Sequence, residues 1–188
     1  AHILDGRVFG CLLTEIFDKV GLGTMVHAND YDRIRQAKKK DAQALYNLAK
    51  HGAKSEALVL RTRQQIEQSI ADFFVYEIDD RIIGCAALRS YPDGKAMELG
   101  ALYVQPFYHG RGVGKKLVEY AKRRAKDRGA KKLLALTTQT SGFFHSSCGF
   151  VEASLKDLPV ARRQELKASG RNSHVLQFPL KKLADSVR

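Results

Sequence analysis

Three alternate glycines form the clearest chemical signature of this sequence, in a run that joins a predicted strand to a predicted helix. Glycine has no β-carbon, so it adopts positive φ and lets main-chain N–H groups approach a ligand closely. At the N-terminus of a helix such groups form an anion site, which the helix dipole strengthens. The sequence therefore predicts that backbone amides hold a phosphate-bearing ligand. The run and the lysine after it consist of His109, Gly110, Arg111, Gly112, Val113, Gly114 and Lys115.

The spacing of these glycines excludes two common phosphate motifs. A P-loop would require glycine at His109 and a serine or threonine at Lys116. A dinucleotide-binding fingerprint would require glycine at Lys115, and it should open the first strand unit of a parallel sheet. The loop therefore belongs to another class of phosphate site.

The formal net charge of +12 raises the question of a nucleic-acid partner. Much of the excess lies in Lys115–Lys132, on a predicted amphipathic helix beside the glycine loop. This charge fits a solvated helix face, attraction of a phosphorylated cofactor or, less well, polynucleotide binding. Aromatic side chains that would stack on bases are scarce there, with Tyr120 alone in the run. We therefore expect no nucleic-acid partner.

The elements on either side of the loop are predicted to position it. Residues 73–78 and 82–88 flank Asp79-Asp80-Arg81, a hairpin pattern, and a third strand at 97–104 follows the turn at 91–94. These three strands predict an antiparallel meander. After the loop, apolar residues recur every four positions from Val113 to Ala125, which predicts a helix that ends at Gly129. The short apolar run 133–136 then predicts a strand parallel to the one before the helix.

Further elements are predicted towards both ends of the chain. The patterns indicate a helix within residues 1 to about 28 that Gly21 and Gly23 end, and a linker near residues 27–31. They also indicate strands at 34–37, 57–63 and 175–178, and helices from about Asp41, around Ile66 and Ile70, and at 140–147.

Length and composition bound the class of protein. The 188 residues suit one ordinary domain with a short appendage, and an apolar content of 44% is ample for one core. Without an apolar stretch of about 20 residues, no membrane association is expected, and a cytoplasmic, soluble protein is the default. The three cysteines, Cys11, Cys85 and Cys148, are odd in number and lack metal-site spacing. We therefore expect a reducing compartment and no metal.

The loop resembles the pyrophosphate loop of the GNAT acetyltransferase superfamily. The resemblance extends to the preceding strand, residues 102–106, and to the late segment 143–150, which ends in Gly149-Phe150. His109 departs from the Arg or Gln that usually opens the loop. The resemblance implies an α/β (α+β by some schemes) fold whose mixed, mostly antiparallel sheet has about six or seven strands flanked by helices. It implies acetyl-CoA as co-substrate, bound by the loop, by Leu102, Tyr103 and Val104, and by Phe144. A bulge near 102–104 is expected to aim a backbone N–H at the attacked carbonyl.

A narrower resemblance is to the acetyltransferase domain of the N-acetylglutamate synthase family. It is carried by residues 58–63, 83–88, 98–104, 136–138 and 171–176. The segments 2–7, 12–17 and 21–26 resemble the carboxyl end of the amino-acid-kinase domain that this family carries ahead of its acetyltransferase. We therefore expect residues 1–28 to be a kinase-like remnant or linker and 29–188 to be the GNAT domain. A homo-oligomer or association with a kinase-like domain is the expected assembly.

The family resemblance implies transfer of acetyl from acetyl-CoA to the α-amine of L-glutamate, a step of arginine biosynthesis. It implies Glu98 as the base that deprotonates the amine, and a hydroxyl at Thr140 or Ser141 as the proton donor to the leaving thiolate. His145 is a further candidate for this donor from its residue type. The acceptor's carboxylates are expected to meet Arg61, Arg171 and Ser173, with Arg89 as a weaker candidate. Acetylation of another small amine or of a protein lysine, and a non-catalytic CoA-binding module, remain as alternatives.

Overall fold

The computed structural model describes residues 2–17, 24–25, 32–54, 61–92 and 94–183, and it divides the chain into two units, Ala1–Tyr31 and Asp32–Arg188. In the first unit, β1 (His2–Ile3) pairs antiparallel with β2 (Thr24–Met25), and α1 spans Cys11–Phe17. The helix predicted within residues 1 to about 28 is absent from residues 2–10, because His2–Ile3 form β1 and Gly10, at φ +73°, directly precedes α1. The predicted stop at Gly21 and Gly23 and the linker at 27–31 lie outside the described residues.

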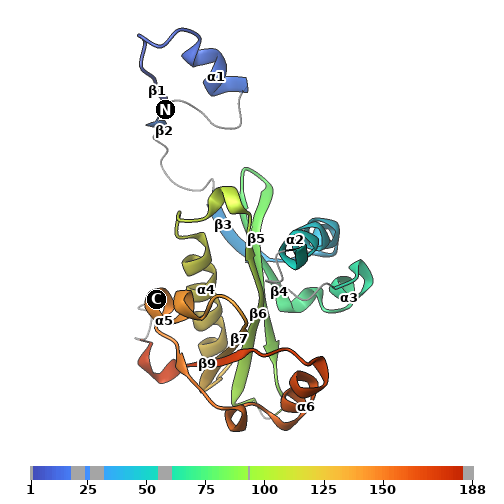
Figure 1. The fold of residues 1–188 in the computed structure, drawn as a ribbon. Helices are drawn as coiled ribbons and strands as arrows, with labels where there is room; N and C mark the ends of the chain where they lie inside the picture. The colour runs from blue at the N-terminus through green and yellow to red at the C-terminus, as the bar shows by residue number, and fades with distance from the viewer. Residues whose placement is uncertain (1, 18–23, 26–31, 55–60, 93, 184–188) are drawn as a thin grey trace. The chain divides into compact units, whose positions relative to one another are not determined.

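The second unit contains the remaining helices and strands (Figure 1). Its strands are β3 (Asp32–Gln36), β4 (Phe73–Ile78), β5 (Arg81–Ser90), β6 (Ala96–Val104), β7 (Lys132–Thr137), β8 (Val151–Glu152) and β9 (His174–Pro179). Its α-helices are α2 (Ala42–Lys54), α3 (Arg63–Gln68), α4 (Val113–Asp127), α5 (Ser141–Cys148) and α6 (Val160–Ser169).

The seven strands form one mixed sheet in the order β3-β4-β5-β6-β7-β9-β8. Antiparallel pairing of β4 with β5 and of β5 with β6 confirms the predicted meander. The predicted parallel partner is also confirmed, because β6 pairs parallel with β7 after the chain crosses over through α4. The expected sheet of six or seven mostly antiparallel strands flanked by helices is therefore correct.

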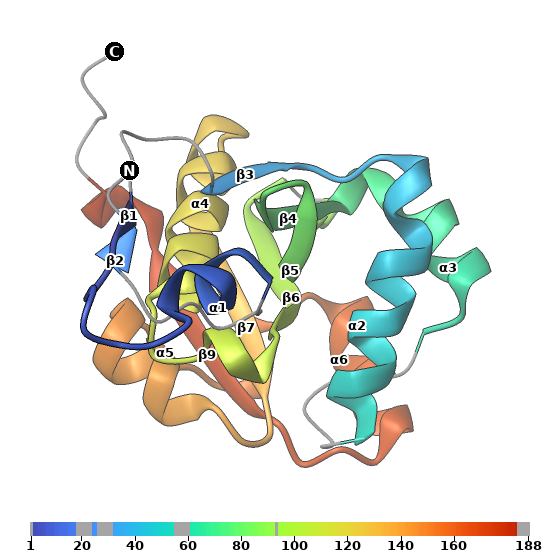
Figure 2. The same cartoon turned by 90° about the horizontal axis from the view of Figure 1, so that it is seen from above.

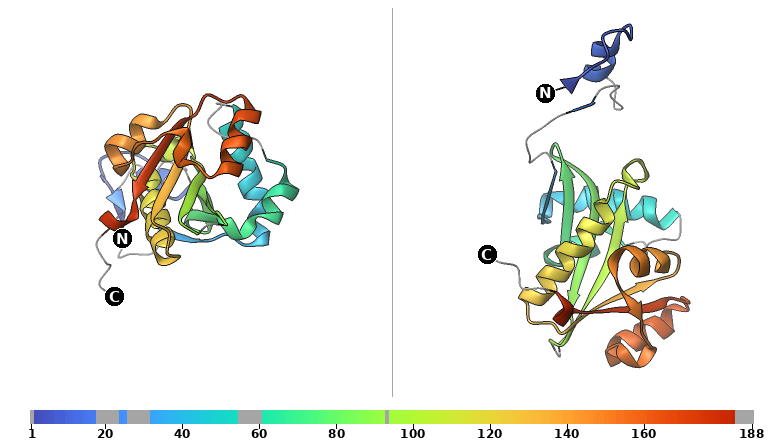
Figure 3. Two further views of the ribbon diagram at one scale, coloured as in Figure 1. Left: turned by 90° about the horizontal axis from the view of Figure 1, so that it is seen from below. Right: turned by 90° about the vertical axis from the view of Figure 1, so that its left-hand side faces the viewer.

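The helices cover the two faces of the sheet. Figure 2 shows α4 and α5 on one side and α2, α3 and α6 on the other, and the right panel of Figure 3 shows α4 running along its face. Alternation along β6 separates the two environments. Met97 and Leu99 belong to the core beneath α4, whereas Ala96 and Glu98 face the side of α6.

Helix α6 and strands β1 and β2 were not predicted from the sequence, and the strand predicted at 57–63 is wrong in its described part. Helix α6 carries the start and stop signals Pro159 and Gly170, but only Leu166 within it is buried, so its apolar periodicity is weak. Strand β8, which directly follows Gly149-Phe150, has only two residues. Of the strand predicted at 57–63, residues 57–60 lie outside the described part, and Arg63 instead begins α3, which Thr62 caps.

Among the described residues, no helix is long and apolar enough to cross a membrane. Within the same ranges, no group of three or more histidine, cysteine or acidic side chains is arranged to hold a metal ion.

Candidate active site

Strands β6 and β7 separate in the middle of the sheet. Their parallel pairing ends at Leu99 and Ala135, although β6 continues to Val104. On its other side, β6 has a bulge, since Cys85 pairs with Tyr103 and Ala87 with Gly100, which leaves two residues opposite one. Ala101, within the bulge, has φ +51°, a strained value for alanine. The bulge expected near 102–104 is therefore present, at Ala101 and Leu102, three residues after Glu98.

The glycine loop presents unused backbone donors to solvent. Gly110 and Gly112 have φ of +74° and +77°, the left-handed region that favours glycine. In the part of the chain that the structure describes, the main-chain N–H groups of residues 110–115 donate to no acceptor, and that of Lys116 is the first to bond, at 3.0 Å to the Gly112 carbonyl. Six consecutive amides without an acceptor at the start of α4 are the arrangement of donors that the spacing predicted, and such an arrangement suits an anion.

The side chains of the loop lie beside these amides. The His109 Nε2 atom is 2.9 Å from the Val104 carbonyl, so the imidazole ties the loop to the end of β6. The Arg111 guanidinium stacks on the Phe107 ring, 4.8 Å from its centroid, and Lys115 is exposed. Two cations therefore border the amides, and the backbone carries the donors.

The third glycine of the loop packs closely against α5. A β-carbon on Gly114 would lie 3.3 Å from the Phe143 ring of α5. Phe144, which the sequence analysis assigned to the cofactor, is 4% exposed and packs on Phe150 in the core. Its ring has little surface to offer a ligand, whereas Phe143 lies next to the loop.

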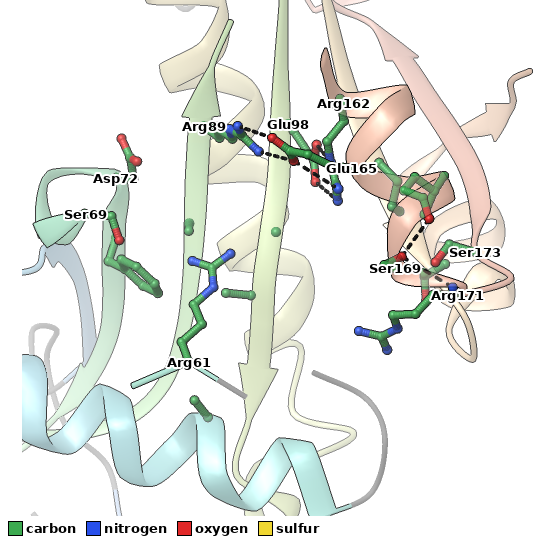
Figure 4. A pocket seen from close by; sticks show the side chains of 18 of the residues that line it. Arg61, Ser69, Asp72, Arg89, Glu98, Arg162, Glu165, Ser169, Arg171 and Ser173 are labelled. Atoms are coloured by element: carbon green, nitrogen blue, oxygen red, sulfur yellow. Dashed lines mark hydrogen bonds and ion pairs between the residues drawn. The ribbon is translucent and has the colours of Figure 1, made fainter. Parts of the chain in front are cut away.

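A cavity of about 490 Å³ opens on the sheet face that α6 covers. Its lining includes Glu98 and all four side chains predicted for the acceptor, which come from separate parts of the chain (Figure 4). Those four are Arg61, Arg89, Arg171 and Ser173. The topology therefore brings the proposed base and the proposed carboxylate-binding groups together in one place, of a size typical for small-molecule sites.

Glu98 is buried in this cavity and held by three hydrogen bonds. The Arg162 guanidinium donates from Nε to Oε2 at 2.7 Å and from Nη2 to Oε1 at 3.0 Å. The Tyr91 hydroxyl also donates to Oε2. Burial, followed by the charge of Glu98, raises the pKa of Tyr91, so this phenol stays a donor at neutral pH. Burial lowers the pKa of Arg162, but its bonds to Glu98 outweigh this and the net shift is upward.

The predicted acceptor-binding arginines differ in their partners. Arg89 forms two bonds with Glu165 of α6, at 2.8 and 2.9 Å, and that pairing raises the pKa of Arg89. Arg61 has no carboxylate partner among the described residues and lies 5.6 Å from the Phe73 ring centroid. Burial lowers the pKa of Arg61. Arg61 is therefore the cation in this cavity most in need of an anionic partner.

Two of the predicted proton donors lie elsewhere. His145 bonds the Phe150 carbonyl through Nδ1 at 2.9 Å and Glu152 through Nε2 at 3.1 Å. Thr140 precedes α5 and shares a hydrogen bond with Thr137 at 2.8 Å. The described lining contains neither of them, nor Ser141, but it contains Thr137 and Thr138. The Leu102 side chain packs against the core beneath α4, and the Tyr103 side chain packs against the apolar cluster on the opposite face of the sheet. The backbone of these two residues is therefore the part that remains as a candidate for contact with a cofactor.

Three residues of this site were missed by the sequence analysis. Arg162 and Glu165 come from the unpredicted helix α6, and Tyr91 lies in the turn between β5 and β6. The i, i+3 spacing of Arg162 and Glu165 places them on one face of a helix, which was the available signal. This spacing indicates a shared face only in a helix, so it could have been used only after α6 had been predicted.

Comparison with known proteins places this geometry in a family. Residues 34–150 match the model of the Acetyltransferase (GNAT) family. The chain is 34% identical over 175 residues to an amino-acid acetyltransferase of Neisseria meningitidis, covering 93% of this chain and 40% of that protein. It is 36% identical over 180 residues to the amino-acid acetyltransferase of Pseudomonas paraeruginosa, covering 96% and 41%.

A solved structure of N-acetylglutamate synthase from Neisseria gonorrhoeae, complexed with coenzyme A and N-acetyl-glutamate, superposes with a TM-score of 0.77 at 34% identity. The match covers 95% of this chain and 42% of that one. The chain thus spans about two fifths of the length of these relatives. The matched residues agree with the separation of β6 from β7 and with the free amides of the glycine loop. The chain belongs to the GNAT acetyltransferase family.

Proposed function

We propose that this chain transfers an acetyl group from acetyl-CoA to the α-amine of L-glutamate, with N-acetylglutamate and CoA as products. The observation that carries the proposal is the cavity in which buried Glu98 lies among four arginines, beside the bulge of β6. The relatives named amino-acid acetyltransferase and the synthase bound to coenzyme A and N-acetyl-glutamate support the same reaction.

The residues of the glycine loop fit a diphosphate. Free N–H groups from Gly110 to Lys115 would bind its oxygens, and Arg111 and Lys115 add positive charge. When bound, acetyl-CoA supplies the activated acetyl group as a thioester. The separation of β6 from β7 after Leu99 leaves main-chain groups of β6 without a β7 partner, and the bulge turns the backbone there. A backbone N–H from this stretch is our candidate donor to the carbonyl oxygen on which charge develops.

Glu98 is the candidate base. An ammonium group has no lone pair, so the acceptor must lose a proton before its nitrogen forms a bond to the acetyl carbon. The proton passes to Glu98, the C–S bond breaks, and its electron pair leaves with sulfur, which then takes up a proton. Thr137 and Thr138 lie in the cavity lining, which Thr140 and His145 do not, so their hydroxyls are our candidates for this proton donor. Burial raises the pKa of the Cys85 thiol to about 12, which leaves it a poor nucleophile and favours direct attack by the amine.

Acidic acceptors suit the charge of the cavity. Arg61 and Arg171 are the candidates that recognise the two carboxylates, together with the Ser173 hydroxyl. Arg89 is less suited, because Glu165 already occupies its guanidinium. A neutral acceptor would leave Arg61 without compensation in a partly desolvated place.

A thiol-release assay tests the proposal. With acetyl-CoA and a panel of free amino acids, we expect turnover with glutamate well above that with glutamine or lysine. Equal rates across the panel, or a preference for lysine or for a peptide, would contradict the proposed acceptor. Coenzyme A binding without turnover of any amine would instead indicate a non-catalytic module.

We also propose the domain assignment and location expected from the sequence. Residues 1–28 would belong to a kinase-like domain or linker and residues 29–188 to the acetyltransferase. All three cysteines are free, which is compatible with a reducing cytoplasm. Limited proteolysis followed by an activity assay on the 29–188 fragment would test the boundary.

A further inference from the structure

Two side chains of helix α6 take part in a series of ion pairs at the proposed acceptor site. Arg162 pairs with Glu98 through two nitrogens, and its third nitrogen, Nη1, lies 3.4 Å from Glu165 Oε2. Glu165, one turn further along α6, is held by Arg89. Figure 4 shows these four side chains gathered at one end of the cavity, with Arg61 and Arg171 apart from them. The element above the proposed base therefore carries the cation that neutralises it.

This pairing leaves little room on Glu98 for the acceptor. An ionised carboxylate has about four lone-pair sites, and three of them face donors from Arg162 and Tyr91. The ammonium of the acceptor has to come within hydrogen-bond reach of one of these sites before its proton can transfer. For Glu98 to act as a base, Arg162 has to give up at least one of its two bonds.

An acidic acceptor brings the group that can loosen this pairing. The contact of Arg162 Nη1 with Glu165 is long and the Arg162 side chain is 20% exposed, so its guanidinium can meet a ligand in the cavity. An acceptor carboxylate held by Arg61 or Arg171 has further lone pairs, and through these it competes with Glu98 for this cation. A neutral amide of the same shape offers no charge, and it leaves the pair with Glu98 intact.

We propose that Arg162 is a positioning residue that makes proton transfer to Glu98 depend on the side-chain carboxylate of the acceptor. The inference rests on the proposed function and adds to it a reason for specificity. In the free protein Arg162 masks Glu98, and the carboxylate of a bound acidic acceptor draws the guanidinium away. Glu98 then accepts the ammonium proton. Selectivity for acidic acceptors is consequently expressed in kcat, in addition to KM.

The test compares kcat and KM for glutamate and glutamine in the wild type, in Arg162→Gln and in Lys167→Gln. Lys167 is an exposed cation on the same helix and serves as the matched control. In Arg162→Gln the base is unmasked for either acceptor, so the ratio of kcat with glutamine to kcat with glutamate should rise at least tenfold. Lys167→Gln should leave this ratio unchanged.

Two further variants exclude a purely structural role. Arg162→Lys keeps the charge but loses the two-point pairing, so the ratio should change in the same direction by a smaller factor. In a Glu98→Gln background, Arg162→Gln should have no further effect on the ratio, because the group it masks is gone. Wild-type affinity for CoA shows that a variant is folded. If Arg162→Gln lacks this affinity, the ratio of the two kcat values is compared in Arg162→Lys instead.

Equal loss of kcat with both acceptors in Arg162→Gln or Arg162→Lys, with the ratio unchanged, would overturn the proposal. A change confined to KM would do so as well. Failure of the wild type to acetylate glutamate is visible before any variant is made, and it would refute the proposed function itself.

Discussion

Replacing Gly112 by alanine separates the role of the glycine loop in ligand binding from its role in folding. Gly112 has φ +77°, and a β-carbon there would meet nothing within 4 Å. The penalty is therefore conformational, about 1–2 kcal/mol for a residue with a β-carbon in the left-handed region. If the free loop of Gly112→Ala relaxes away from this conformation, binding must restore it. Since 1.4 kcal/mol is tenfold in affinity, the Kd for CoA should rise about 5- to 30-fold.

Gly129→Ala is the matched control for this experiment. Gly129 follows the other end of α4, has φ +79°, and also has open space at the position of a β-carbon. In thermal unfolding without ligand, Gly112→Ala should lose no more stability than Gly129→Ala, because its free loop relaxes. Only Gly112→Ala should weaken CoA binding in isothermal titration calorimetry. Equal CoA affinity of the two variants would refute the assignment of the loop as the diphosphate site.

Three further variants test the site and the fold. Glu98→Gln should lower kcat at neutral pH by at least about 100-fold and by less at alkaline pH, where more amine is already deprotonated; an equal loss across the pH profile argues against a base. Arg171→Ala should raise KM for glutamate roughly 10- to 100-fold and KM for acetyl-CoA far less; the reverse order would remove Arg171 from the acceptor site. Glu77 is buried against Arg35 of β3, and this hydrogen bond lowers the pKa of Glu77 from 4.5. The stabilisation from this pair is complete above pH 4.5 and is lost as the pH falls through the lower folded-state pKa. Glu77→Gln should therefore lower the free energy of unfolding by about 3 kcal/mol at pH 7 and make it fall less steeply with decreasing pH below 4.5. An equally steep fall in the variant and the wild type would contradict this.

The parts of the fold that follow from local pattern were predictable. The meander from β4 to β6 and the crossover through α4 follow from apolar runs, turn residues and a four-residue repeat. The backbone conformation of the loop was predictable from glycine spacing, since positive φ at Gly110 and Gly112 is readily adopted by this residue type.

The parts that depend on contacts distant in sequence were not predictable from pattern. Nothing in the local sequence indicates that Arg162 contacts Glu98, 64 residues away. Helix α6 has only one buried residue, so no apolar periodicity predicts it. The choice between Phe143 and Phe144 depends on which ring turns towards Gly114, a matter of helix rotation. For His145, the residue type suggested acid–base chemistry, but its two ring nitrogens bond the Phe150 carbonyl and Glu152.

The central claim is that backbone amides of the glycine loop bind a diphosphate. Nuclear magnetic resonance of the ¹⁵N-labelled protein tests it directly, by comparing titration with CoA and with pantetheine, which lacks the diphosphate. The account predicts that the amide signals of residues 110–115 shift strongly with CoA and hardly at all with pantetheine. Loop amides that stay unmoved by CoA, or that respond equally to both compounds, would contradict it.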